Sequence, residues 1–239
     1  MKFGKMWILV LIAGIVVLVA FVPQVLKPTP TPNETAKDLS ENSDLTAIKS
    51  FTGKSDPEVT FVNTDLPTPY FRVGKVTKIG NGENMDAVEG WVRKVNVYDS
   101  KELIDGKCSV YQYHTDQRNH SLVAVVIKGL KPSEIEALAK NGNTCTLESG
   151  NILKINTVEA EAIAMEYLAR AVPNFDQIKD NFKYSTQQNG ESHEWLWEDK
   201  EYKLPDGLSS RPYPGPIIRI SVYGNNEIQY WNTVPLFEN

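Results

Sequence analysis

The chain has 239 residues, a formal net charge of −5 at pH 7 and a mean hydropathy of −0.33. This length suffices for one or two small domains. An acidic balance without a basic cluster argues against nucleic acid as a partner and against binding of the body to anionic membrane surfaces. No cofactor motif is present, and we expect no cofactor.

Residues 7–26 are predicted to form a transmembrane helix. Trp7 to Val22 contains no polar side chain, and the apolar run extends to Leu26. Twenty residues at about 1.5 Å each cover the roughly 30 Å hydrocarbon core of a bilayer. The alternative is a cleaved signal peptide, but Ala20 with Leu18 two positions before it matches the small-x-small cleavage pattern poorly.

The flanking charges predict the orientation of this helix. Lys2 and Lys5 precede it, whereas Lys27 alone follows closely. The positive-inside rule therefore places residues 1–6 in the cytoplasm and the bulk of the chain outside. We predict a single-pass protein of the cell membrane with an extracytoplasmic body.

Residues 27–57 are predicted to be a proline-rich linker or stalk. Prolines alternate from Pro28 to Pro32, which favours an extended polyproline conformation. The following residues are polar with few apolar positions, a composition typical of disorder. One short helix near Asp44–Phe51 is the alternative within this stretch.

Residues 58–150 are predicted to form a mostly β unit with one short helix. The segment 91–98 alternates between apolar and polar side chains, and 109–113 with 121–128 are typical of a hairpin. Pro132 suits the first turn of the short helix.

The two cysteines, Cys108 and Cys145, are predicted to form a disulfide, because an even number in an oxidising compartment is usually paired. Two buried free thiols are the alternative. Asn33 and Asn119 fit the glycosylation acceptor pattern, although such triplets are frequent by chance.

Residues 151–239 are predicted to form a helix followed by four antiparallel strands. Asn156 or Thr157 can cap the helix, and Pro173 ends it. Asn189 and Gly190 give a strong hairpin signal between two of the strands. The fold class is therefore α+β: an N-terminal transmembrane helix and then antiparallel sheets, each with a packed helix.

The segment Ile155-Asn-Thr-Val-Glu-Ala-Glu-Ala-Ile-Ala164 resembles the opening helix of PepSY-type domains, which are related to peptidase propeptides. His193–Trp197 stands where the family has an aromatic strand, and Ile220–Ile228 resembles its closing hairpin. The family's Asp-x-x-x-Gly turn is replaced by Tyr223-Gly-Asn-Asn226. The resemblance covers about a third of the chain. It implies binding or restraint of a partner, such as a peptidase, and carries no catalytic residues.

Trp195 and Trp197 share one face of their strand because side chains alternate in direction. If exposed, they would suit a peptide or a glycan, with Arg211 and Tyr213 of the following proline-rich loop as further contacts. The alternative is that both tryptophans pack on the apolar stripe of the helix at Ile163–Leu168.

His114, Asp116 and His120 lie within seven residues around one hairpin, and these residue types could bind zinc. A turn does not make them converge, however, and no fourth ligand is near. We therefore expect no metal and no enzymatic activity, and predict a membrane-anchored protein that binds or restrains an envelope or secreted partner. A module that binds a small ligand or a glycan and, behind it, a metal-dependent hydrolase are the alternatives.

Overall fold

The computed structural model describes residues 32–65, 71–79, 82–87, 94–147, 155–189, 192–202, 208–212 and 216–237. The chain divides into two compact units, Met1–Ser40 and Glu41–Asn239, and all contacts below belong to the second. The predicted transmembrane segment, residues 7–26, lies outside the described residues. Among the helices that are described, none is long and apolar enough to cross a membrane.

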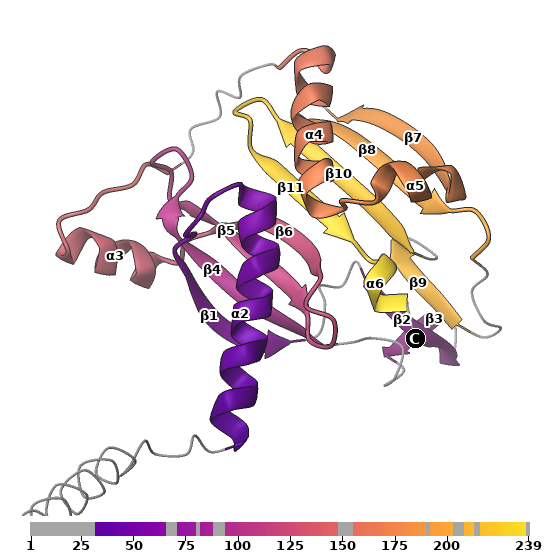
Figure 1. Ribbon diagram of the computed structural model, residues 1–239, viewed down its shortest axis with the longest axis horizontal. Helices are drawn as coiled ribbons and strands as arrows, with labels where there is room; N and C mark the ends of the chain where they lie inside the picture. Colours follow the sequence, from indigo (N-terminus) through magenta and orange to yellow (C-terminus); the bar gives the residue numbers. More distant parts are fainter. Residues whose placement is uncertain are drawn as a thin grey trace, which may run out of the picture. The chain divides into compact units, whose positions relative to one another are not determined.

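The centre of the fold is an antiparallel eight-stranded sheet with the order β1-β4-β5-β6-β11-β10-β8-β7 (Figure 1). Its strands are β1 (Val59–Asp65), β4 (Val95–Leu103), β5 (Ser109–Asp116), β6 (Leu122–Gly129), β7 (Phe182–Asn189), β8 (Ser192–Asp199), β10 (Ile217–Tyr223) and β11 (Ile228–Asn232).

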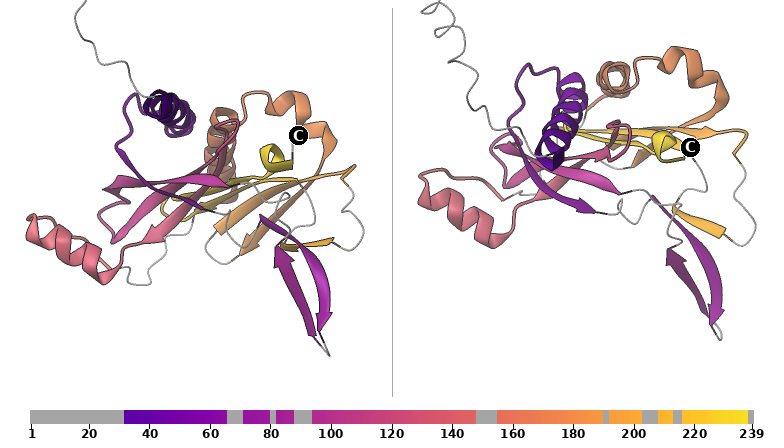
Figure 2. Two further views of the ribbon diagram at one scale, coloured as in Figure 1. Left: turned by 90° about the horizontal axis from the view of Figure 1, so that it is seen from below. Right: turned by 60° about the horizontal axis from the view of Figure 1, so that its bottom comes forward.

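A second, three-stranded sheet has the order β3-β2-β9. Its strands are β2 (Phe71–Ile79), β3 (Gly82–Ala87) and β9 (Leu208–Pro212). Figure 2 shows this small sheet on the side of the large sheet that faces away from the helices.

Two long helices, α2 (Pro32–Thr52, in its part from Glu41 on) and α4 (Thr157–Ala171), lie on the same face of the large sheet (Figures 1 and 2). The shorter helices are α3 (Pro132–Lys140), α5 (Phe175–Ile178), the 3-10 turn η1 (Lys179–Asn181) and α6 (Val234–Phe237). Asn156 caps α4, because its side chain accepts a hydrogen bond from the Glu159 amide at 2.9 Å.

The α+β class is confirmed, but the two predicted units share one large sheet rather than forming separate sheets. Each half supplies a helix and four strands of this sheet, and the halves join where β6 pairs with β11, through Val125 with Tyr230 and Ala124 with Trp231. Both strands carry apolar side chains on both faces. Such a strand at the edge of a sheet would expose apolar side chains to water. Pairing of β6 with β11 buries this apolar surface and is therefore favourable.

The prediction of a stalk over residues 27–57 is corrected for residues 32–52, which form α2, and the short helix considered near Asp44–Phe51 lies within it. Ile48 and Phe51 are buried, at 0% and 3% exposure, and belong to the same core as α4 and the sheet. Asp44, Ile48 and Phe51 are spaced i, i+4 and i+7, so one narrow face of the helix points to the sheet while the other faces remain polar. The narrowness of this stripe explains why the composition predicts disorder.

The predicted disulfide between Cys108 and Cys145 is confirmed, with 5.0 Å between the two Cα atoms. It ties the segment after α3 to the start of β5. Helix α3 itself buries none of its side chains, so packing contributes little to its position. At its start, the Glu134 carboxylate accepts a hydrogen bond from the Lys131 amide at 2.6 Å, and this contact, together with Lys128, holds the pKa of Glu134 below its usual value.

We predict that removing the disulfide, by Cys108→Ala with Cys145→Ala, loosens residues 130–147 while the large sheet persists. In the chain-entropy model, a disulfide that closes a loop of this length contributes at most about 4 kcal/mol to the free energy of unfolding. Helix α3 buries no side chain in the core, so we expect the loss of the disulfide to affect this segment and not the sheet. Limited proteolysis with mass spectrometry should show new cleavage in this segment first. Simultaneous cleavage throughout the body would contradict the prediction.

Candidate binding groove

The two tryptophans predicted as binding residues are buried beneath the helices. Trp195 and Trp197 are 2% and 5% exposed and belong to the core that α4 covers. Trp197 contacts Phe175 edge-on, with 5.0 Å between the ring centroids. Neither ring is presented to a partner, so the structure favours the alternative, in which both pack beneath the helix.

The other two predicted contact residues do not join them. Arg211 lies in β9, where its backbone pairs with Arg72 of the small sheet. Its side chain and Tyr213 lie outside the described part of the structure. No common surface of the four residues is therefore seen in the described part.

His114, Asp116 and His120 are held in three different environments. The ring of His114 lies 2.9 Å from the Gln112 side-chain oxygen. The Asp116 carboxylate accepts hydrogen bonds from the amides of the following hairpin turn, and His120 reaches α2. Within the described ranges, no group of three or more His, Cys, Asp or Glu side chains could hold a metal ion.

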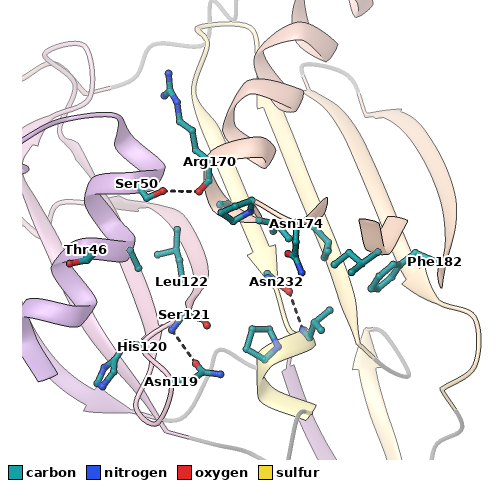
Figure 3. A pocket seen from close by; sticks show the side chains of 18 of the residues that line it. Thr46, Ser50, Asn119, His120, Ser121, Leu122, Arg170, Asn174, Phe182 and Asn232 are labelled. Atoms are coloured by element: carbon teal, nitrogen blue, oxygen red, sulfur yellow. Dashed lines mark hydrogen bonds between the residues drawn. The ribbon is translucent and has the colours of Figure 1, made fainter. Parts of the chain in front are cut away.

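A groove of about 790 Å³ opens on the helix-covered face of the large sheet (Figure 3). Helix α2 and the β5–β6 hairpin form one wall, and the end of α4 with the turn after it forms the other. The floor is made by β6, β10 and β11, through Leu122, Ile218 and Asn232. The groove therefore lies over the junction between the two halves of the sheet.

The rim of the groove carries mainly neutral hydrogen-bonding side chains. In Figure 3 these come from both walls: Thr46, Ser50, Asn119, Ser121 and Asn174. The Asn174 side chain does not cap α5. Asn119 accepts one hydrogen bond, from the Ser121 amide at 3.0 Å. An amide side chain offers both donors and an acceptor, so this rim is suited to the backbone of a peptide.

One end of the groove is closed where α2 meets α4. The Ser50 hydroxyl donates a hydrogen bond to the Arg170 carbonyl at 2.9 Å, and the rings of Phe51 and Tyr167 lie 5.0 Å apart. Gly53 ends α2 with a φ of +69°, and a Cβ there would lie 3.2 Å from the Arg170 guanidinium. Glycine is therefore favoured at this position, because it adopts the positive φ without strain and leaves room for Arg170.

Beside the groove, a buried carboxylate ties α2 to the sheet. Asp44 is fully buried, and one of its oxygens, Oδ2, accepts hydrogen bonds from Asn96 at 2.8 Å and from the Tyr98 hydroxyl at 2.7 Å. Its other oxygen lies 2.9 Å from Nδ1 of His120, whose side chain is 26% exposed and lines the groove. His120 also has a φ of +59°, a conformation that few non-glycine residues adopt.

Sequence reasoning missed the role of Asp44 and misplaced that of His120. The polar residues around Asp44 in the sequence predict an exposed carboxylate. The local sequence gives no sign that Asn96 and Tyr98 contact it. The only available signal is the position of Asp44 one turn before Ile48 on the narrow apolar face of α2.

Comparison with known proteins gives no indication of the function. No protein-family model matches this chain, and neither curated proteins nor solved structures give a match.

We predict that Asp44→Ala lowers the free energy of unfolding by roughly 3 kcal/mol, because it removes the buried acceptor that three side chains share. Asp56→Ala is the matched control. Asp56 is exposed, and its replacement should change the free energy by less than about 0.5 kcal/mol. Chemical denaturation checks both. Equal effects would mean that Asp44 does not stabilise α2.

We predict that Gly53→Ala destabilises the protein more than Gly106→Ala. Both glycines have φ near +70°, but a Cβ at Gly106 meets no atom within 4 Å. The shared cost of a side chain in this conformation is about 1 kcal/mol. The additional loss of stability in Gly53→Ala, again roughly 1 kcal/mol, is the cost of displacing the Arg170 side chain. Thermal unfolding of the two variants gives the difference, and no difference would show that Arg170 moves aside freely.

Proposed function

We propose that this protein is a membrane-anchored extracytoplasmic binding protein that holds or restrains an exported protein partner. It engages an extended segment of that partner in the groove between α2 and α4. The groove, with its apolar floor and neutral polar rim, is the observation that carries the proposal.

The chemistry of the groove favours a peptide segment over a charged small molecule. The accessible apolar side chains of Pro173, Ile178 and Val234 line the groove and can contact alternate side chains of an extended strand. The asparagine and hydroxyl side chains of the rim can pair with peptide amides and carbonyls. Arg170 lines the groove, but its guanidinium is directed away from it, over the ring of Tyr167 (Figure 3), which leaves the rim largely neutral.

The sequence supports the location and the type of role. The apolar segment at residues 7–26 would anchor the chain, with residues 1–6 inside and the body outside. The PepSY-like features of residues 155–228 are in keeping with a protein that restrains a partner such as a peptidase. Helix α4 and the strands that follow it would be the PepSY-like unit. Helix α2 and the strands that follow it would be a second unit in which a helix likewise precedes the strands.

The proposal is tested by photo-crosslinking in cells. A photoreactive amino acid at Asn174, inside the groove, should give one dominant crosslinked exported protein after capture and mass spectrometry. The same amino acid at Gln177, exposed on α5 and outside the groove, is the control. Equal crosslinking from both positions, or none from Asn174, would contradict the groove as the contact surface.

We predict that Asn174→Arg reduces capture of that partner by about tenfold or more, because a long charged side chain fills the groove near its centre. Gln177→Arg adds the same charge to the same short helix and should leave capture unchanged. Quantitative pull-down with the full-length protein measures both. Circular dichroism confirms that the variants fold.

A further inference from the structure

A second hollow, of about 420 Å³, lies on the opposite side of the contact between α2 and α4. The end of α2, the β4–β5 turn, Tyr167 of α4 and the β10–β11 turn enclose it. The hydrogen bond from Ser50 to Arg170 separates it from the groove. It has the size of a small-molecule site.

The walls of this hollow are mainly aromatic. Phe51 and Tyr167 lie with their ring centroids 5.0 Å apart, and Tyr111 and Tyr113 with theirs 6.4 Å apart. All four side chains line the hollow. The faces of such rings carry partial negative charge and attract cations, and the attraction grows when water is excluded.

The charged groups around the hollow leave an excess of one carboxylate. Of its three acidic residues, Glu102 pairs with Lys54 and Glu227 pairs with Lys107. The third, Asp105, makes no ion pair with any residue of the described ranges. Arg170 approaches the Tyr167 ring, but its charge is paired with Glu166. The hollow is therefore electrostatically suited to one positive charge.

The hydroxyl of Tyr113 is a polar group without a partner in the described part of the structure. Its residue is only 5% exposed, and it lines the hollow. The neighbouring Tyr111 hydroxyl, by contrast, accepts a hydrogen bond from the Ile228 amide at 3.2 Å. Burial raises the pKa of both tyrosines, so at neutral pH the Tyr113 hydroxyl is uncharged and its oxygen can accept a hydrogen bond from an N–H group.

We propose that this hollow binds a primary alkylammonium group, with the aliphatic chain against the aromatic rings. The ammonium would donate to the Tyr113 oxygen, and the exposed Asp105, which lines the same hollow, would supply the opposite charge. A primary ammonium fits better than a quaternary one, because only the former has hydrogens to donate. The group can be the end of a free amine or of a lysine side chain, and this site is independent of the proposed groove.

The test is a titration of the full-length protein, followed by ligand-observed NMR. The probes are n-butylammonium, its neutral analogue 1-butanol, tetramethylammonium, and acetyl-lysine amide as the peptide form. We expect n-butylammonium to bind more tightly than 1-butanol and tetramethylammonium. A further gain for acetyl-lysine amide would identify a lysine side chain as the source, whereas a loss would identify a free amine. No binding of either amine at up to roughly 10 mM would overturn the proposal.

Two variants and one control test the named contacts. Asp105→Asn removes the charge and keeps a residue that tolerates the positive φ of 48°, and Tyr113→Phe keeps the ring and removes the hydroxyl. Each should weaken n-butylammonium binding by about fivefold, the usual contribution of one hydrogen bond or ion contact. Asp56→Asn alters an exposed carboxylate that does not line the hollow and should change binding by less than about twofold. Unchanged binding in both variants would also overturn the proposal.

Discussion

The pairing of β6 with β11 is the interaction on which the rest of this structure depends. It joins two strand groups that are far apart in the sequence into one sheet, through Ala124 and Val125 on one side and Tyr230 and Trp231 on the other. It also merges their interiors, because Ile48 and Tyr113 of the first half belong to the same core as Leu168 and Trp195 of the second. A separation of the halves would expose both strands, which are apolar on both faces.

The same junction creates the two hollows. Once the half-sheets are joined, α2 and α4 lie on one surface and contact each other through Ser50 with Arg170 and through Phe51 with Tyr167. The space on one side of this contact becomes the groove, and the space on the other becomes the aromatic hollow. Each hollow takes residues from both halves, so neither exists in an isolated half. Asp44 then holds the sheet-facing side of α2 against β4 and the β5–β6 hairpin.

The predictions from sequence succeed where the signal is local. The helix over residues 157–171 has a cap at Asn156 and a regular apolar stripe, and the disulfide joins the two cysteines of the sequence. They fail where the deciding contact is distant. α2 has a narrow apolar face, which becomes sufficient only because a sheet and a second helix lie against it. The direction in which Trp195 and Trp197 face is fixed by alternation, but whether that face is covered depends on α4. The hydrogen-bond partners of Asp44 lie 52 to 76 residues away, beyond any local pattern.

Among the strands that the structure describes, β11 comes last in the sequence, yet it lies in the middle of the sheet. During synthesis, the first half therefore has an apolar edge at β6 that stays unpaired until β11 emerges. Contacts of such long sequence separation slow folding, because the loop between the partners must close before they form. A chain that stalls before residue 228 would keep β6 and β10 open to other strands, which favours aggregation or capture by a chaperone. The order of the strands thus makes synthesis through β11 a condition for a stable sheet.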